Sequence, residues 1–375
     1  MEEIKYNEEK NNWYFRIDVG RDPKTKKRRQ VFRSFKTKKE AKVACAKIRT
    51  QVEEGTYFEP SIEMFKDYIQ RWFTSIYKPS VSLTTSESRW YIIKNHLIPY
   101  FKNMNLKEID TFSIDCLYDE KREEGLQPSY IKIMHHLLNS AFKKAVKWSL
   151  LRQNPVEGAT PPTIKRKKKK APWTKDELKQ FLEFVLDTEV SAPYVLASFT
   201  GARRGEVLGL RWKDINFDNQ TIHIQQSLTR TKEKGLIFTD LKNNSSDREI
   251  VVSPFVIEVL RLHQEKQNKL KKKLGNEYQD FDLVTCAVNG KPIDPRNLLR
   301  QYYSLIDKAL VPKITFHDLR HLHATMLLHM KVHAKVVADR LGHSRIQVTL
   351  DTYSHGSDEL QRETAIQFEN ELFGS

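Results

Sequence analysis

The feature that most constrains the fold of this 375-residue chain is a short segment near its middle that cannot belong to a packed core. Residues 161–172 hold two prolines, then six consecutive cationic residues, then another proline. A run of like charges repels itself and stays in water, and prolines favour an extended backbone. The segment is therefore predicted to be a linker, and the chain must fold as separate units on its two sides. The length suffices for two or three domains, each with its own core.

The charge balance of the chain points to a polyanionic partner. The 64 lysines and arginines outnumber the 48 aspartates and glutamates, so the formal net charge is +16. Such an excess is typical of proteins that bind nucleic acid. The linker cations are candidate contacts to DNA phosphates, although a nuclear-localisation signal is an alternative in a eukaryote; they are Lys165, Arg166, Lys167, Lys168, Lys169 and Lys170.

The three cysteines indicate a reducing compartment. Cys45, Cys116 and Cys286 are far apart and odd in number, which fits neither a disulfide framework nor a zinc site. The first residues lack the cationic and then apolar pattern of a secretory signal, and no apolar run has the length of a membrane span. We expect a cytoplasmic protein without a membrane partner.

Residues 1–58 are predicted to form a small α+β module with a three-stranded sheet and one helix. Aromatic and β-branched residues favour strands at 13–19 and 28–35, and Thr37 is placed to cap a helix that runs towards Glu54. Arginines on both strands are expected to give the sheet one basic face, and β-ribbons do enter DNA grooves. The candidate DNA-binding residues of this module are Arg16, Lys27, Arg28, Arg29 and Arg33.

Residues 59–160 are predicted to form an all-α domain. Apolar residues recur at helical spacing in four segments, 62–77, 84–101, 113–124 and 130–148. The first segment places its aromatic and apolar residues on one side, namely Phe65, Tyr68, Ile69, Trp72 and Phe73.

Residues 173–375 are predicted to form a mainly helical α+β domain with a small antiparallel sheet. Thr174 and Glu177 form a capping box that opens its first helix. Short strands are expected within 215–224 and 237–252, followed by one long helix at 255–275. A tail helix at 359–372 has an apolar stripe that consists of Leu360, Ala365, Phe368 and Leu372.

Polar residues between 315 and 355 are spaced too regularly to be ordinary surface. Thr315 and Asp318 predict a helix start, and its buried side is expected to hold Leu319, Ala324, Met326, Leu327 and Met330. A second short helix at 334–341 should end at Gly342 in the left-handed conformation, and a third short helical run follows. These elements present four candidate reactive side chains, which are His317, Arg320, His343 and Tyr353.

This set of side chains suggests attack on a phosphodiester. A tyrosine can act as a covalent nucleophile but needs a base or a cationic neighbourhood. The planar fork of arginine binds two phosphate oxygens and never loses its charge. A second arginine, Arg203, follows Gly201 and precedes a helical run at 207–212, where backbone amides add positive potential.

Four segments in this order resemble the signature of the tyrosine recombinases, the phage integrase family. The segments are TGARRGE, HDLRHLHAT, LGHS and DTYSH, which contain Arg203, His317, Arg320, His343 and Tyr353. The resemblance implies a DNA strand transferase that uses neither metal nor ATP. It also implies that Tyr353 forms a 3'-phosphotyrosyl intermediate, that Arg203 and Arg320 hold the phosphate, and that His317 and His343 assist.

The family also uses a lysine on a β-hairpin as general acid, and Lys242 is the best match, although Lys232 and Lys234 lie nearby. Glu206 matches an acidic position of the family, which we interpret as orienting an arginine.

The module at 1–58 resembles arm-binding modules of integrases from phages and conjugative transposons of Gram-positive bacteria. The resemblance therefore implies integration and excision of a mobile element in a bacterial cytoplasm. It implies arm-site DNA binding by 1–58, core-site binding by 59–160 and catalysis by 173–375. It further implies a homotetramer on DNA, coupled through the tail helix, and an accessory DNA-bending or excision factor. Docking of the tail on its own subunit is the alternative.

Three other functions stay open at this point. A chromosome-dimer resolvase and a type IB topoisomerase-like enzyme would use the same residues. A catalytically inactive DNA-binding regulator is the alternative from a different class.

The histidines near 320 allow a metal site as a competing interpretation. Histidines four apart on one helix face can bind zinc, and the candidates are His317, His321, His323, His329 and His333. A metal hydrolase would normally place a glutamate base between the ligands, and this sequence has none there. We expect no metal and no other cofactor.

Overall fold

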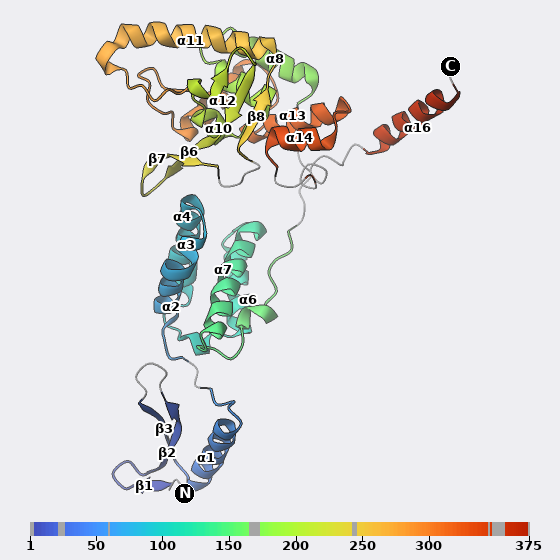
Figure 1. Ribbon diagram of the computed structural model, residues 1–375. Coiled ribbons are helices and arrows are strands. Elements are labelled where there is room, and N and C mark those ends of the chain that lie inside the picture. The colour runs from blue at the N-terminus through green and yellow to red at the C-terminus, as the bar shows by residue number, and fades with distance from the viewer. Residues whose placement is uncertain are drawn as a thin grey trace. The chain divides into compact units, whose positions relative to one another are not determined.

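The computed structural model describes residues 4–21, 27–58, 61–164, 173–241, 246–343, 346 and 357–373 (Figure 1). The chain divides into two compact units, 1–166 and 167–375. Their buried apolar residues form a small cluster within 15–45, a large one within 65–159 and another large one within 173–322. Within the described ranges, no helix is both long and apolar enough to cross a membrane.

The N-terminal module is a three-stranded antiparallel sheet with one helix on one face, as predicted. The strands follow the order β1 (Lys5–Asn7), β2 (Asn12–Arg21) and β3 (Arg28–Phe35). Helix α1 (Lys38–Glu53) starts at a capping box between Thr37 and Glu40, in which each backbone N–H is bound by the other side chain. The core of the module consists of Phe15, Ile17, Ala41 and Cys45.

The prediction that the arginines give this sheet one basic face is wrong in detail. Residues directly opposite in an antiparallel pair have their side chains on the same side. Arg16 is opposite Phe32, whereas Arg33 is opposite Phe15, which belongs to the core. Arg16 therefore lies on the outer face, and Arg33 lies on the helix-covered side, where it is nevertheless exposed at the edge strand. The outer face is instead aromatic and cationic, because the Arg16 guanidinium lies 5.9 Å from the Phe32 ring centre and Tyr14 lies beside Phe32.

The four predicted helical segments of residues 59–160 are present, but two of them change their winding near the end. Helix α2 (Phe65–Trp72) continues as the π-helix η1 (Phe73–Tyr77) and then α3 (Lys78–Ser80). In the same way, α4 (Leu83–Ile92) continues as η2 (Ile93–Leu97) and α5 (Ile98–Tyr100). Each π segment precedes a proline, Pro79 or Pro99. A proline ring clashes with the carbonyl four residues earlier in a regular α-helix, and the wider π turn removes that clash.

The remaining helices close the bundle around a shared core. They are η3 (Leu106–Glu108), α6 (Thr111–Glu123), α7 (Pro128–Lys147) and η4 (Pro155–Gly158). All five apolar residues predicted for the first helical segment are buried, including Trp72. Tyr68 lies in the same core and donates a hydrogen bond from its hydroxyl to the Ala141 carbonyl at 2.6 Å, which ties α2 to α7.

The C-terminal unit is mainly helical with two small antiparallel sheets. Its helices are α8 (Lys175–Leu186), α9 (Ala192–Thr200), α10 (Arg204–Gly209), η5 (Trp212–Asp214), α11 (Pro254–Leu274), η6 (Gly275–Glu277), α12 (Pro295–Lys308), α13 (Phe316–His329), α14 (Ala334–Leu341) and α16 (Ser357–Phe373). Its strands are β4 (Ile215–Asn216), β5 (Thr221–Ile224), β6 (Gln226–Thr231), β7 (Gly235–Asp240) and β8 (Arg248–Val251).

One sheet has the order β4-β5-β8. Strand β6 pairs with β7 in a separate hairpin (Figure 1). The strand β6 was not predicted, because its residues are mostly polar. The fold class expected from the sequence is confirmed.

The tail helix α16 is present as predicted. Its described apolar side chains are exposed, among them Ala365, Ile366, Phe368, Leu372 and Phe373.

Candidate active site

Helix α13 carries two of the predicted reactive side chains. The Asp318 carboxylate accepts hydrogen bonds from the Thr315 amide and hydroxyl, each at 2.7 Å, and so fixes the start of the helix. Leu319 and Ala324 are buried as predicted. Met330 is 70% exposed, against the prediction, because it lies one residue past the end of the helix.

Arg320 is almost completely buried and holds two turns of the chain. Its Nη1 donates to the Gly201 carbonyl at 2.8 Å, and its Nη2 donates to the Leu341 carbonyl at 2.6 Å. Gly201 follows α9 in the left-handed conformation (φ 64°), and Leu341 is the last residue of α14. One guanidinium on α13 thus ties the end of α14, which follows in the chain, to the turn after α9, which lies 119 residues earlier.

Arg203 precedes α10, which begins at residue 204 instead of the predicted 207. Its Nη1 donates to Glu206 Oε1 at 2.8 Å, and its backbone N–H donates to Glu206 Oε2 at 2.9 Å. The Arg203 side chain remains 40% exposed, whereas that of Glu206 is 2% exposed. Burial raises the pKa of the Glu206 carboxyl, but Arg248 and Arg203 outweigh burial and hold this pKa below its usual value. Glu206 is therefore a buried anion that orients the exposed guanidinium of Arg203.

Arg248 belongs to the same cluster, although we did not predict it as a site residue. Its side chain is 6% exposed and its Nη2 donates to Glu206 Oε2 at 2.9 Å. The sequence contains a usable signal. Arg248 is two residues before Ile250 on β8, so both side chains point to the same buried face of the strand. An arginine at a core-facing strand position needs buried partners.

His343 follows α14 directly. Gly342 ends that helix in the left-handed conformation (φ 66°), as predicted, and the His343 amide donates to the Ala338 carbonyl at 3.0 Å. Partial burial, together with Arg320, Arg203 and Arg248, lowers the pKa of the His343 imidazole to about 4. His343 is therefore neutral at pH 7 and can donate or accept a hydrogen bond next to the arginines.

The histidines of α13 differ from one another in their surroundings. His317 is exposed, and its ring centre lies 4.7 Å from that of His321. His323 is buried, and its Nδ1 lies 2.9 Å from the Ser198 carbonyl, which ties α13 to α9. Burial has the largest effect on the pKa of His323, and the positive charge of Arg340 has the next largest. Both lower this pKa, which is about 4. In the described part of the chain, no group of three or more histidine, cysteine or acidic side chains is placed to hold a metal.

The structure thus brings Arg203, Arg320 and His343 together from α10, α13 and the end of α14. His317 extends from the same helix as Arg320. Lys242, Tyr353 and the six linker cations lie outside the described residues. The cluster concentrates positive charge around one partly exposed guanidinium, an arrangement that suits a phosphate group.

Three family models match the chain. The phage integrase family model matches residues 173–359, the N-terminal SAM-like domain of phage integrases matches 64–121, and the arm DNA-binding domain matches 3–52.

Relatives of nearly the same length share this organisation. A XerC-like tyrosine recombinase of Caldanaerobacter subterraneus is 29% identical, and the match covers 96% of each chain. The ICEBs1 integrase of Bacillus subtilis is 27% identical, with 96% of this chain and 98% of the relative covered. Both names agree with the resemblance found in the sequence.

The fold also matches solved structures. The Tn1549 transposon integrase in complex with a circular intermediate DNA has a TM-score of 0.68 at 20% identity, over 82% of this chain and 100% of the other. A lambda integrase tetramer bound to a Holliday junction has a TM-score of 0.56 at 17% identity, over 92% and 93% of the two chains. At these identities the likeness shows the fold.

Proposed function

Because the chain belongs to the phage integrase family of tyrosine recombinases, we propose that it integrates and excises a mobile element by cutting and rejoining DNA at specific sites. The observation that carries this proposal is the cluster of Arg203, Arg320 and His343, which three separate elements assemble around one partly exposed guanidinium.

In the cleavage step, the phenol oxygen of Tyr353 attacks the scissile phosphorus. The bond to the 5'-oxygen of the next nucleotide breaks, and a 3'-phosphotyrosyl link forms. His317 takes the phenol proton, and Lys242 gives a proton to the departing 5'-oxygen. A general acid in such a place contributes typically ~10² to 10⁴ in rate.

The arginines bind the non-bridging oxygens, on which negative charge grows as phosphorus becomes five-coordinate. Arg203 is suited to this contact because Glu206 orients its guanidinium while leaving it partly exposed. His343 adds a hydrogen bond as a neutral donor. Losing one such donor costs roughly 10² to 10³ in rate.

The rejoining step is the reverse reaction. A 5'-hydroxyl from another duplex attacks the phosphotyrosyl bond and restores a phosphodiester, so the free energy of the broken bond is kept in the covalent link. This chemistry needs no ATP, and arginines take the place that a metal would have at the phosphate. We therefore propose a reaction without metal or other cofactor.

The proposed division of labour follows the predicted domains. Residues 1–58 bind arm sites, 59–160 bind core sites, 161–172 form a basic linker along the DNA backbone, and 173–375 hold the active site and tail. In the arm module, the outer sheet face with Tyr14, Arg16 and Phe32 is the best candidate for groove contact, since cationic and aromatic side chains lie there together. Lys27, Arg28 and Arg29 flank it at the start of β3 and are exposed.

Assembly is the other part of the proposal. Four copies act on two duplexes in the bacterial cytoplasm, with an accessory DNA-bending or excision factor. The exposed apolar side chains of α16, such as Phe368 and Phe373, favour docking on a neighbouring subunit.

Covalent trapping on attachment-site DNA tests the chemistry. The DNA is nicked close to the cleavage point, so that the released fragment diffuses away and the adduct accumulates. The wild type should form a denaturant-resistant adduct in EDTA, and Tyr353→Phe should form none while it binds the DNA with unchanged affinity.

Tight binding without an adduct from the wild type would favour a DNA-binding regulator. An adduct that persists in Tyr353→Phe would identify another tyrosine as the nucleophile. Relaxation of supercoiled DNA that lacks an attachment site would favour the topoisomerase-like alternative.

A further inference from the structure

Arg248 is the one arginine of the cluster for which the proposed chemistry gives no role. Its side chain nevertheless donates hydrogen bonds to three residues, Glu206, Arg340 and Ser246. We propose that Arg248 is a positioning residue for DNA cleavage, which fixes Arg203 through Glu206 and His343 through the end of α14. This inference rests on the proposed function, because it concerns the placing of the same phosphate-binding groups.

The three sides of the Arg248 guanidinium bind three different parts of the chain. Nη2 donates to Glu206 Oε2 at 2.9 Å, and the same oxygen accepts the Arg203 backbone N–H. Nε donates to the Arg340 carbonyl in α14 at 2.7 Å. Nη1 donates to the Ser246 carbonyl at 2.9 Å, in the segment that leads from Lys242 into β8.

The contact to α14 bears directly on His343. The carbonyls in the last turn of a helix have no partners within the helix and carry its negative partial charge. Two consecutive carbonyls of this turn, those of Arg340 and Leu341, accept hydrogen bonds from Arg248 and Arg320. Such charge-assisted bonds are roughly twice as strong as neutral ones. Together they fix the helix end from which Gly342 and His343 extend.

The contact to Glu206 bears on Arg203. With two cationic partners, the carboxylate is held with Oε1 towards the Arg203 guanidinium and Oε2 towards Arg248. Without Arg248, Glu206 Oε2 would keep only the Arg203 backbone N–H as a partner. The carboxylate would then be held less tightly, and the Arg203 guanidinium would be oriented less precisely. A mutation far from the reacting atoms that misplaces a catalytic group by about 1 Å can cost around 10²-fold in rate.

Arginine is required at this position because of its geometry. Its Nε and two Nη atoms point in three fixed directions in one plane, whereas a lysine ammonium is a single point charge on a flexible stem. Lysine could keep the ion pair with Glu206 but could not also reach the Arg340 and Ser246 carbonyls in the same way. Arg248→Lys should therefore restore only part of the function that Arg248→Gln loses.

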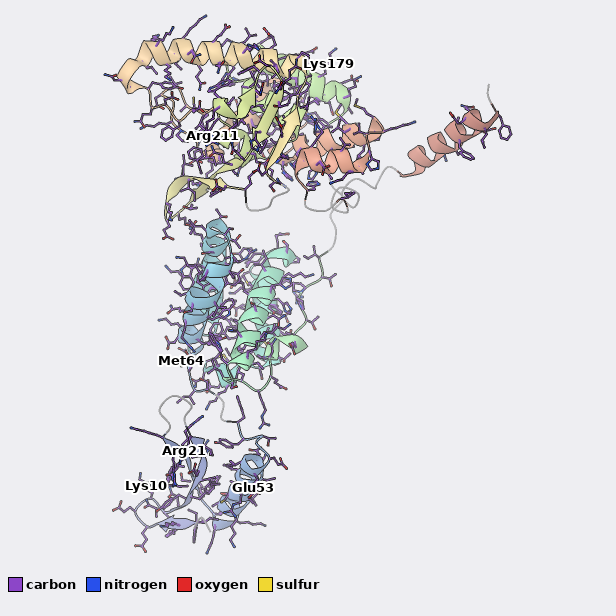
Figure 2. The ribbon with its side chains drawn as sticks, viewed as in Figure 1. Lys10, Arg21, Glu53, Met64, Lys179 and Arg211 are labelled. Atoms are coloured by element: carbon purple, nitrogen blue, oxygen red, sulfur yellow. The ribbon has the colours of Figure 1, made fainter. Side chains whose placement is uncertain are left out.

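The test must separate positioning from simple loss of stability. The chain offers a matched control in Arg211, which is labelled in Figure 2. Arg211 pairs with the buried Asp214 through Nε at 2.8 Å and Nη2 at 3.2 Å. No hydrogen bond of the Arg211 side chain to a proposed site residue is present among the described residues. Arg211→Gln removes a comparable ion pair from the same unit.

The first measurement uses the full-length protein and the nicked attachment-site DNA at saturating protein concentration. We expect Arg248→Gln to lower the first-order rate of adduct formation roughly 10- to 100-fold, with the dissociation constant for DNA unchanged. Arg248→Lys should give an intermediate rate. Arg211→Gln should cleave at the wild-type rate, with rates corrected for the folded fraction of each variant.

The second measurement needs no cleavage. In protein with labelled histidines, NMR titration reports the pKa of His343, which Arg320, Arg203, Arg248 and His321 face. We expect this pKa to rise in Arg248→Gln, because one nearby cation is removed, and to stay unchanged in Arg211→Gln. The His343 resonance should also broaden or shift at neutral pH in Arg248→Gln, because its helix end is released.

The outcomes are distinct. A wild-type cleavage rate for folded Arg248→Gln would overturn the inference, and so would an equal rate loss in Arg211→Gln. If the wild type itself forms no adduct, the proposed function fails. In that case an altered His343 resonance still establishes that Arg248 positions this residue, and an unaltered one refutes it. If Arg248→Gln does not fold, Arg248→Lys takes its place in both measurements.

Discussion

Substituting Gly201 by alanine should disturb the point where three elements of the active site meet. Gly201 has φ +64°, and a Cβ placed on it would lie 2.6 Å from Leu341 Cδ2 and 3.0 Å from His323 Cδ2. Its carbonyl accepts the Nη1 bond of Arg320. The new methyl group must therefore displace the side chains of Leu341 and His323, or move the turn that holds Arg320.

The magnitude follows from two terms. A left-handed conformation costs a residue with a Cβ roughly 1–2 kcal/mol relative to glycine. Forcing a methyl group into a packed site costs typically ~1–3 kcal/mol. We therefore expect Gly201→Ala to lower the free energy of unfolding of the C-terminal unit by about 2–5 kcal/mol.

Gly235→Ala is the matched control. Gly235 also has a positive φ, +67°, but no atom lies within 4 Å of its added Cβ. It should lose only the conformational term, about 1–2 kcal/mol. The difference between the two variants isolates the steric contact with Leu341 and His323.

Native-state hydrogen exchange of the α11 amides, measured by mass spectrometry, gives the unfolding free energy of this unit in the full chain. Adduct formation should also be slower in Gly201→Ala, because Arg320 loses its alignment, and unchanged in Gly235→Ala. Equal stability losses in the two variants would refute the close packing of α14 against the Gly201 turn.

Two further substitutions test the buried polar contacts. Glu206→Gln should destabilise the C-terminal unit by roughly 3–5 kcal/mol at pH 7, because the buried guanidinium of Arg248 loses its anion. The pKa of Glu206 is lowered in the folded state, so its contribution is present above the unfolded pKa, near 4.3, and is lost as the pH falls through the folded pKa. The difference in unfolding free energy between the wild type and Glu206→Gln should therefore shrink in acid, and a difference that does not vary with pH would contradict this account. Tyr68→Phe should lower the unfolding free energy of the helical bundle by about 1 kcal/mol, since the buried Ala141 carbonyl loses its hydrogen bond. Urea unfolding followed by tryptophan fluorescence measures this difference, and equal unfolding free energies for the wild type and the variant would contradict the prediction.

Three helix starts were predicted well because they depend on residues three apart. Thr37, Thr174 and Thr315 each form a capping box with the acidic residue that the sequence places three positions later. The helix end at Gly342 was equally local, because glycine alone adopts the left-handed conformation without strain.

Sheet contacts were predicted less well because they depend on distant partners. The face occupied by Arg33 depends on which residue of β2 lies opposite, and the register shift between Asp18 and Arg21 is not visible in the sequence. The strand β6 is stabilised by pairing with β7, which the sequence of β6 does not indicate, because Leu228 is its one apolar residue.

The sequence by itself determined the helical segments, their caps, the cationic composition and the ordered motifs that indicate a tyrosine recombinase. These properties are local, or they are carried by the identity and order of residues along the chain. Only the tertiary structure decided that Arg203, Arg320 and His343 meet, and that Arg248 joins them through Glu206 and the end of α14. The physical reason is that a buried charge must find its partners in space, and the Glu206 carboxylate and the Arg340 carbonyl are 42 and 92 residues away from Arg248.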